Sequence, residues 1–526
     1  MSNFLELTFV SSKSYADPFN EIEVDVEFSD PQGHARRVPA FWAGGDTWRV
    51  RYAPEVAGRH HFQLSCSDQD NPDLHGQTGD LEVGDILKNP LLSHLRVGDN
   101  GRNFERRDGS PFFWLGDTWW LGLCARKGWG PAEFTTLARD RVAKGFTVVQ
   151  IVAGLYPDLP PFDPRGFNEA GYPWETEYAR INPAYFDQAD RRIECLVEEG
   201  LVPCLVAAWG YHLPWLGVER MKKHWRYMIA RWAVYPLVWC LAGEGAMPYY
   251  LSEHREEDTL LQKQGWTEIG RYVRAIDPYH HPVTIHPTSC GRDTVEDDSV
   301  LDFDMLQTGH GDWKAAPNTV ETVTREYARK PAMPVIVGEV SYEGHMQISW
   351  HGVQRFMFWA SVLSGAAGHT YGAGGIWQQN TREQPHGPSP HGGTYEDTPW
   401  DVAAQLPGSS HLGLGKALLL RYAWWNFAPH PEWVEPGWNA SNYMLPYAAG
   451  ISGEVRMVYI PARTYQWTGP LIQQLEPDMC YHAFYFNPIN AQEYDLGTAA
   501  GDAGGNWQAP WVPLGQDWVL VLERRP

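Results

Sequence analysis

The feature that most constrains the fold is a regular alternation of short apolar segments and longer amphipathic segments between residues 112 and 424. Eight apolar runs of four to seven residues have the character of buried strands. They lie at 112–116, 146–151, 202–208, 237–242, 282–285, 303–307, 334–338 and 366–371. Helical periodicity follows them at 131–144, 184–199, 217–233, 257–276, 317–330, 350–364 and 410–424.

Eight strands that alternate with helices over about 330 residues are typical of a closed (β/α)8 barrel. An open doubly wound sheet would carry a glycine fingerprint after its first strand, and GDTWWLG (116–122) does not match one. We therefore expect an α/β protein whose catalytic barrel spans 89–428.

The two ends of the chain have a different, period-2 pattern. IEVDVEF, WRVRYAP and HHFQLSC alternate within residues 1–88, and VRMVYIP, YHAFYFNP and DWVLVLER do so within 429–526. Turn-forming residues separate these runs. The sequence predicts a small β-sandwich on each side of the barrel, with 88–109 as a linker.

Composition narrows the classes of partner. The net charge of −22 disfavours nucleic acid and anionic membranes, and no apolar run approaches the roughly 20 residues that cross a bilayer. Seven cysteines without CxxC spacing and a first segment without a signal-peptide pattern lead us to expect a cytoplasmic protein. Twenty-six Trp and 25 Tyr suit stacking on sugars, although Trp-rich cores give similar counts.

The active site of such a barrel lies at the carboxyl ends of its strands, so the residues there are the candidates. Two of them are glutamates, Glu244 after the fourth strand and Glu339 after the seventh, each preceded by a glycine. Hydrolysis of a glycosidic bond requires two carboxyl groups. Either Glu could instead pair with an Arg at the barrel rim. We expect substrate contacts from polar and aromatic residues near these strand ends: Asp117, Trp119, Gln150, Trp209, Tyr211, His286, Gln307, His310, His369, Tyr371 and Trp377.

Four segments carry a family resemblance: GDTWW (116–120), GFTVVQ (145–150), and the GE pairs at 243–244 and 338–339. With them the chain resembles the apiosidase-like family of barrel hydrolases, which is related to a large clan of retaining glycosidases. The flanking regions resemble the N-terminal domain and the C-terminal β-sandwich often joined to such barrels. The resemblance implies a glycoside hydrolase with Glu244 as acid/base and Glu339 as nucleophile.

The same resemblance implies double displacement through a glycosyl-enzyme intermediate, with carboxyl oxygens roughly 5 Å apart. Glu244 should then have a raised pKa while Glu339 stays ionised. His310 is expected to hydrogen-bond the nucleophile. The chain departs from the pattern at Gly243, where the clan usually has Asn, and at Glu244, where apiosidase-like members often have Asp.

Two other functions remain open at this point. A metal-dependent barrel hydrolase would use strand-end histidines, but no HxH or HExxH is present, so we expect no metal and no cofactor. A non-catalytic carbohydrate-binding protein would not need two facing glutamates. Long loops after the second and eighth strands favour exo-action on short oligosaccharides, as in a furanosidase or related glycosidase. A homo-oligomer is compatible with the sequence.

Overall fold

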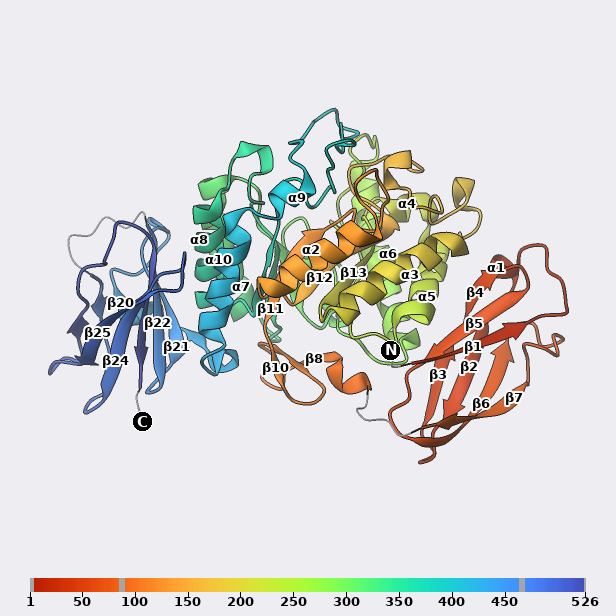
Figure 1. The fold of residues 1–526 in the computed structure, drawn as a ribbon, viewed down its shortest axis with the longest axis horizontal. Coiled ribbons are helices and arrows are strands. Elements are labelled where there is room, and N and C mark those ends of the chain that lie inside the picture. The colour runs from red at the N-terminus through yellow and green to blue at the C-terminus, as the bar shows by residue number, and fades with distance from the viewer. Residues whose placement is uncertain (1–3, 85–89, 463–468, 525–526) are drawn as a thin grey trace.

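The computed structural model describes residues 4–84, 90–462 and 469–524 and is built around a parallel eight-stranded barrel. All eight expected strands are present, and the α/β barrel is confirmed. They are β11 (Trp114–Trp119), β12 (Val148–Leu155), β13 (Val202–Ala208), β14 (Val238–Cys240), β15 (Val283–Thr284), β16 (Asp304–Gln307), β17 (Val335–Glu339) and β18 (Gly368–Tyr371). Figure 1 shows the barrel in the middle of the molecule.

The strand order, β15-β14-β13-β12-β11-β18-β17-β16, leaves β15 and β16 as the two ends of one sheet. Main-chain and side-chain hydrogen bonds close this seam. The Val283 N–H donates to the Asp302 carboxylate at 2.9 Å, and the Thr284 hydroxyl donates to the Phe303 carbonyl at 3.0 Å. The sheet therefore curves into a nearly complete barrel.

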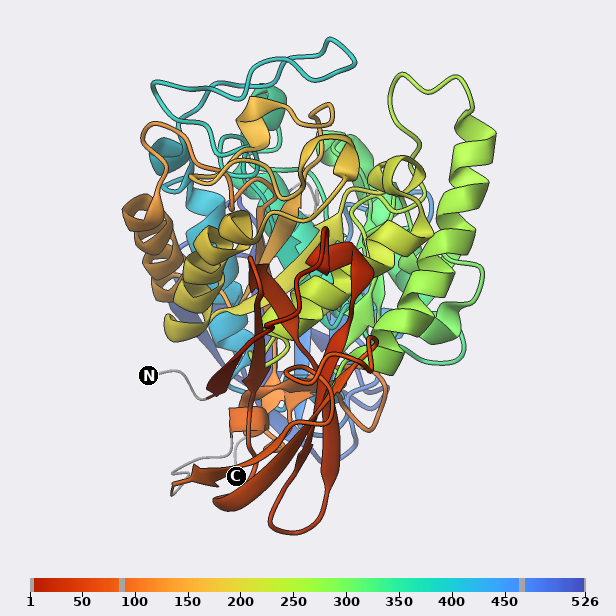
Figure 2. The same cartoon turned by 90° about the vertical axis from the view of Figure 1, so that its right-hand side faces the viewer.

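The helices cover the outside of the barrel, as the two perpendicular views show (Figures 1 and 2). Their bounds agree with the periodic segments of the sequence to within a few residues. They are α2 (Pro131–Ala143), α3 (Pro183–Glu198), α5 (Val218–Trp232), α6 (Arg255–Ile276), α7 (Ala316–Ala328), α8 (His351–Leu363) and α10 (Pro407–Leu419), with the short α4 (His212–Leu216) and α9 (Trp400–Ala403). α3, α5 and α7 each bury one apolar face, whereas α8 is buried on most sides.

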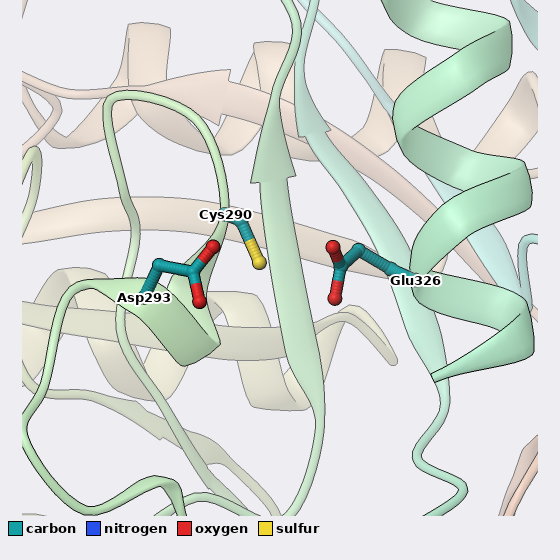
Figure 3. A group of neighbouring side chains, drawn as sticks. All are labelled: Cys290, Asp293 and Glu326. Carbon is teal, nitrogen blue, oxygen red and sulfur yellow. The ribbon is translucent and has the colours of Figure 1, made fainter. Parts of the chain in front are cut away.

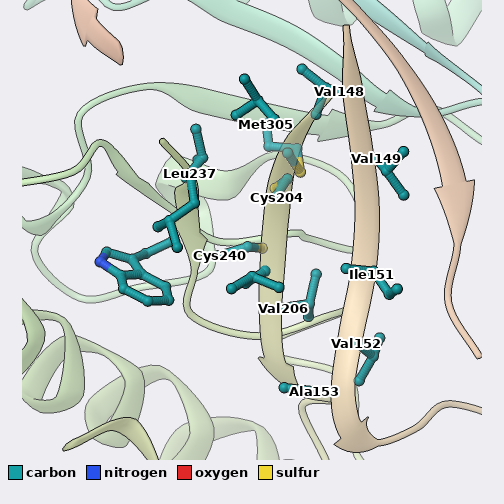
Figure 4. Packing of buried hydrophobic residues seen from close by; sticks show 14 of the residues in the cluster. Val148, Val149, Ile151, Val152, Ala153, Cys204, Val206, Leu237, Cys240 and Met305 are labelled. Carbon is teal, nitrogen blue, oxygen red and sulfur yellow. The ribbon is translucent and has the colours of Figure 1, made fainter. Parts of the chain in front are cut away.

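The barrel core consists of branched aliphatic residues and thiols from neighbouring strands. Figure 4 shows Val148 of β12 near Cys204 of β13, with Met305 of β16 close by. These three side chains are fully buried. Strands that are buried on both faces read as continuous apolar runs, which is why the sequence showed them clearly.

Antiparallel sheets flank the barrel at both ends of the long axis of the molecule (Figure 1). The N-terminal pair is β1 (Leu5–Val10), β5 (Thr47–Tyr52) and β4 (Phe41–Gly44) against β3 (Ala35–Pro39), β2 (Val24–Ser29), β6 (Gly58–Cys66) and β7 (Thr78–Val83), with the short α1 (Pro18–Glu21) between β1 and β2. The C-terminal pair is β19 (Ala428–Pro429), β21 (Tyr447–Ile451), β22 (Val455–Ile460), β27 (Trp518–Glu523), β24 (Cys480–Phe486) and β25 (Glu493–Ala500) with β20 (Val434–Glu435), β23 (Leu471–Ile472) and β26 (Trp507–Gln508).

The segment expected as a plain linker contains structure. Residues 95–112 form a small sheet of β8 (Leu95–Val97), β9 (Phe104–Arg106) and β10 (Pro111–Phe112). Phe104 packs against Trp114 and Phe303, with ring centroids 5.8 and 4.9 Å away. The aromatic contact explains the difference, because it buries apolar surface at the amino end of the barrel strands.

Over the described ranges, no helix is long and apolar enough to cross a membrane. All seven cysteines are free thiols.

Candidate active site

A cavity of about 220 Å³ opens at the carboxyl ends of the barrel strands. Glu339 is the last residue of β17, and Glu244 lies four residues beyond the end of β14. The walls come from strand ends and loops: Trp120, Pro157, Asp158, Trp209, Glu244, Met247, Tyr250, Gln307, His310, Glu339, Tyr342, His345, Trp377 and Tyr395. The two glutamates therefore share one cavity with a largely aromatic wall.

The amide of Gln307 bridges the two carboxylates. Its Nε2 donates to Oε1 of Glu244 at 3.0 Å and to Oε1 of Glu339 at 3.1 Å. The two Oε1 atoms can be no farther apart than the sum of these distances, about 6 Å. Gln307 thus fixes the spacing of the carboxyl groups from the end of β16.

Two histidines surround Glu339. Nε2 of His310 lies 2.7 Å from Oε1, and Nε2 of His286 lies 3.2 Å from Oε2. Burial acts to raise the pKa of Glu339, but the two imidazoles outweigh it and hold that pKa well below its usual range. Glu339 is therefore ionised at any working pH.

Glu244 has the opposite environment. Burial and, after it, the negative charge of Glu339 raise the pKa of Glu244 to about 7. Hydrogen bonds from Gln307 and from the Trp209 indole N–H, which is 3.1 Å from Oε2, work in the other direction. One carboxyl group is poised to give a proton while its neighbour remains charged.

The glycine at 243 is explained by Trp209. A Cβ placed on Gly243 would lie 2.1 Å from Cε3 of that indole, so no side chain fits. Glu244 itself has φ 42, in the left-handed region that non-glycine residues rarely adopt. The indole therefore stands where the usual Asn side chain of the clan would begin, and the strained turn directs Glu244 toward the cavity.

Five of the residues expected from the sequence lie at the cavity. Trp209, Gln307, His310 and Trp377 line it, and His286 contacts Glu339 from a fully buried position. Trp209, His286 and His310 each contact one of the two glutamates, and Gln307 contacts both.

Asp117 and Trp119 do not reach the cavity, which corrects the expectation that they bind substrate. Oδ2 of Asp117 accepts hydrogen bonds from Arg141 Nε at 2.6 Å and from Trp119 Nε1 at 2.7 Å. The Trp119 ring packs edge-on against Phe134 of α2. Both side chains point outward from β11 into the helix layer, because alternate residues of a strand face opposite sides.

The expectation that His369 and Tyr371 of β18 bind substrate is wrong for the same reason. His369 packs against Phe358 of α8, and burial lowers its pKa to about 3. The Tyr371 hydroxyl donates to Glu343 at 2.6 Å. Both side chains lie between the barrel and its helices and are at most 1% exposed.

Gln150 and Tyr211 are also buried away from the cavity. The Gln150 amide donates to the Gly338 carbonyl at 2.9 Å, inside the barrel. The Tyr211 hydroxyl donates to the Tyr156 carbonyl at 3.2 Å, behind the cavity wall. Their direct contact with substrate hydroxyls, expected from the sequence, is not supported by these positions.

Several cavity residues were missed because they come from loops. Trp120 follows the strand end by one residue, and its indole donates to the Tyr342 hydroxyl at 3.0 Å. His345 follows Glu339 by six residues, and its Nδ1 lies 3.3 Å from Oε1 of Glu396. Trp120 and Tyr342 lie within the segments GDTWW and IVGEVSYEG and could have been found there, whereas Asp158 and Tyr395 lie in long loops without a sequence signal.

One cluster outside the cavity has the composition of a metal site. The ligand atoms of Cys290, Asp293 and Glu326 lie within 4.8 Å of one another (Figure 3). None of the three lines the cavity. Nη1 of Arg329 lies 2.8 Å from Asp293 and 3.2 Å from Glu326, so an arginine already serves as their counter-ion. The cluster gives no support to a metal-dependent hydrolase.

Solved structures with this fold are known. A protein described as a glycoside hydrolase matches at 22% identity and a TM-score of 0.68, over 83% of this chain and 98% of its own. A glycoside hydrolase family 5 protein from Bacteroides vulgatus matches at 21% identity and a TM-score of 0.67, over 82% of this chain and 93% of its own. A further structure from Bacteroides vulgatus covers 99% of this chain and 98% of its own, at 19% identity and a TM-score of 0.69. At these identities the similarity shows the fold.

Comparison of the sequence with models of protein families identifies the class of enzyme. No curated protein matches the chain. A domain of unknown function named DUF5060 matches residues 3–67. The model described as the apiosidase-like catalytic domain matches residues 98–426, which is more than half of the chain and includes both glutamates. The chain is therefore a member of the apiosidase-like family and a glycoside hydrolase.

Proposed function

We propose that the enzyme is a retaining glycosidase with Glu339 as nucleophile and Glu244 as acid/base. The observation that carries the proposal is the Gln307 bridge, which limits the two Oε1 atoms to at most about 6 Å apart. Retaining enzymes have carboxyl groups about 5–5.5 Å apart, and inverting enzymes need about 6.5–9.5 Å to admit a water. The opposed protonation states of the pair add support.

The first step forms a covalent intermediate. A Glu339 oxygen attacks the anomeric carbon and forms an ester bond, while the glycosidic C–O bond breaks. The proton of Glu244 passes to the leaving oxygen, so the leaving group departs as a neutral alcohol.

The second step reverses these roles. The Glu244 carboxylate takes a proton from water as the water oxygen attacks the anomeric carbon. The bond to Glu339 breaks, which regenerates the free carboxylate and the protonated acid. Two displacements at one carbon retain the configuration of the sugar.

The shape of the cavity favours exo-action on short oligosaccharides. Its volume of about 220 Å³ is below the roughly 300–1,000 Å³ of pockets for drug-sized ligands. The loops after β12 and β18 join beside the cavity, where the Ser389 hydroxyl donates to the lining residue Asp158 at 2.6 Å. A small site bounded by such loops accepts a terminal sugar more readily than the middle of a chain.

The test begins with a panel of aryl pentofuranosides, hexofuranosides and pyranosides, with the product anomer followed by NMR. We expect retention, and we expect Glu339→Gln to lower turnover by at least about 10³-fold, since covalent catalysis is lost. Glu244→Gln should be rescued by azide, which yields a glycosyl azide of retained configuration. An inverted first product, or full turnover by Glu339→Gln, would overturn the proposal.

A further inference from the structure

A third carboxylate, Asp158, lines the same cavity as the two glutamates. It lies in the loop after β12 and is 8% exposed. Its backbone has φ 54, a left-handed conformation that is strained for a residue other than glycine. A strained, buried acid that the proposed two-step chemistry does not use calls for another role.

Neighbouring loops hold Asp158 in place. The Ser389 hydroxyl donates to its Oδ1 at 2.6 Å, which joins the loop after β12 to the loop after β18. Tyr250 and Tyr395 line the cavity beside it, and burial followed by the charge of Asp158 raises the pKa of the Tyr250 phenol. The carboxylate is thus surrounded by hydroxyl groups, which are the groups that a sugar also offers.

The charge balance of the cavity is one-sided. Among the residues that the structure describes, three carboxylates and no Arg or Lys line the cavity. His310 is paired with Glu339, and His345 is paired with Glu396. His391, 3.7 Å from Asp158, is outside the lining set. A sugar carboxylate would find no free cation here.

We infer that Asp158 binds hydroxyl groups of the sugar and makes the cavity selective for uncharged glycosyl units over uronic acids. Hydroxyl donors to a carboxylate form short, charge-assisted hydrogen bonds, which favour a neutral polyol. A uronate would bring a further negative charge into a desolvated site that already holds Asp158, without a cationic partner, which is strongly unfavourable. The inference rests on the proposed function only in that a sugar occupies the cavity.

Binding to the Glu339→Gln protein tests this without turnover. Trp120, Trp209 and Trp377 line the cavity, so tryptophan fluorescence reports occupancy. The probes are the methyl glycosides of glucose, galactose, xylose and arabinofuranose, and those of glucuronic and galacturonic acid. We expect at least one neutral glycoside to bind and both uronides to bind at least tenfold more weakly at pH 7.

Variants in that background locate the selectivity. Asp158→Asn should weaken the neutral glycoside about tenfold and reduce the discrimination against uronides. Asp401→Asn is the matched control, because it makes the same charge change at a half-exposed position outside the cavity and should leave both affinities unchanged. Ser389→Ala keeps the carboxylate but removes its hydroxyl partner and should have a smaller effect.

Three results would overturn the inference: a uronide that binds as tightly as the best neutral glycoside, no binding of any neutral glycoside, or Asp158→Asn without effect. The experiments also distinguish a failure of this inference from a failure of the proposed function. If the wild type cleaves a uronide and Glu339→Gln does not, the function stands and the inference falls. If neutral glycosides bind as expected but the wild type cleaves none, the function falls and the inference stands.

Discussion

At the scale of single residues, the site depends on two carboxyl groups with opposite environments only a few ångströms apart. Histidines on one side keep Glu339 ionised, whereas burial and that same charge keep Glu244 protonated up to about pH 7. Each group shapes the other, because the charge on Glu339 is one cause of the raised pKa of Glu244. Neighbouring residues that adjust this balance should change the pH dependence as well as the rate.

The pH dependence of kcat/KM should follow the protonation of Glu244. Since the first step needs its proton, kcat/KM should fall as pH rises through about 7, the pKa of that group. Glu339 should add no acidic limb in the working range because its pKa lies far below it. A profile that stays level up to pH 9 would contradict the assignment of Glu244 as acid.

Trp209→Phe should move the basic limb to higher pH, because the indole N–H stabilises the ionised form of Glu244. A hydrogen bond to a charged group contributes about 1.5–3 kcal/mol, so kcat for poor leaving groups should fall about 10- to 100-fold. Dinitrophenyl glycosides need little acid assistance and should be less affected. If kcat fell equally for good and poor leaving groups and the pH profile did not move, Trp209 would contribute packing alone and would not tune Glu244.

Gly243→Ala tests the close approach of backbone and indole. Its Cβ would lie 2.1 Å from Trp209, so the ring or the turn at Glu244 must shift. Overpacking of this kind costs about 1–3 kcal/mol of unfolding free energy, and the displaced acid should lower kcat. In a Trp209→Ala background the same change should cost little further stability, because the clashing ring is gone, while activity should stay low. An active, fully stable single variant would show that the turn adapts freely.

At the scale of elements, buried ion pairs attach the strands to the helix layer. The Asp117 carboxylate on β11 holds Arg141 of α2 at 2.6 Å, and both side chains are fully buried. An arginine in that position depends on its partner, since an unpaired buried charge is strongly destabilising. Asp117, the aspartate of GDTWW, thus has a structural role in this protein.

Asp117→Ala should lower the unfolding free energy by about 3–5 kcal/mol, because Arg141 loses its counter-ion. Denaturant unfolding measures the loss, and Asp99→Ala, whose side chain is 93% exposed, serves as the control. The folded fraction should keep its KM. A stable variant with a raised KM would instead place Asp117 in contact with substrate.

At the scale of the whole molecule, an ion-pair network joins the N-terminal sheets to the barrel. Asp190 of α3 lies 2.6 Å from Arg51 of β5 and 2.7 Å from Arg231 of α5. Burial acts to raise the pKa of Asp190, but the two guanidinium groups lower it to about 2. The N-terminal sheets are therefore coupled to the barrel by charge as well as by packing.

Asp190→Asn should lower the thermal transition by removing the common partner of both arginines, at a cost of about 3–5 kcal/mol near neutral pH. Because the folded pKa lies below the unfolded value of about 3.9, the stabilisation is complete above that value and is lost as pH falls through about 2. Calorimetry should show the difference between wild type and variant shrinking between pH 4 and 2. A difference independent of pH would rule out the ion pairs as its cause.

The sequence by itself determined the barrel and its two catalytic candidates. Strands buried on both faces appear as continuous apolar runs, and parallel strands place their carboxyl ends on one face. This is sufficient to bring Glu244 and Glu339 together without knowledge of any contact. Gln307 and His310 could be predicted on the same ground.

Only the tertiary structure decided which strand residues face the cavity and which loops complete it. Asp117 and His369 occupy strand ends, but their side chains point outward. Neighbouring residues of a strand face opposite sides, and a continuously apolar segment does not show which of them point inward. Asp158 enters the cavity because the loop after β18 packs on it through Ser389, a contact between residues 231 positions apart. Contacts of this kind depend on how the closed barrel brings its loops together, which local sequence cannot specify.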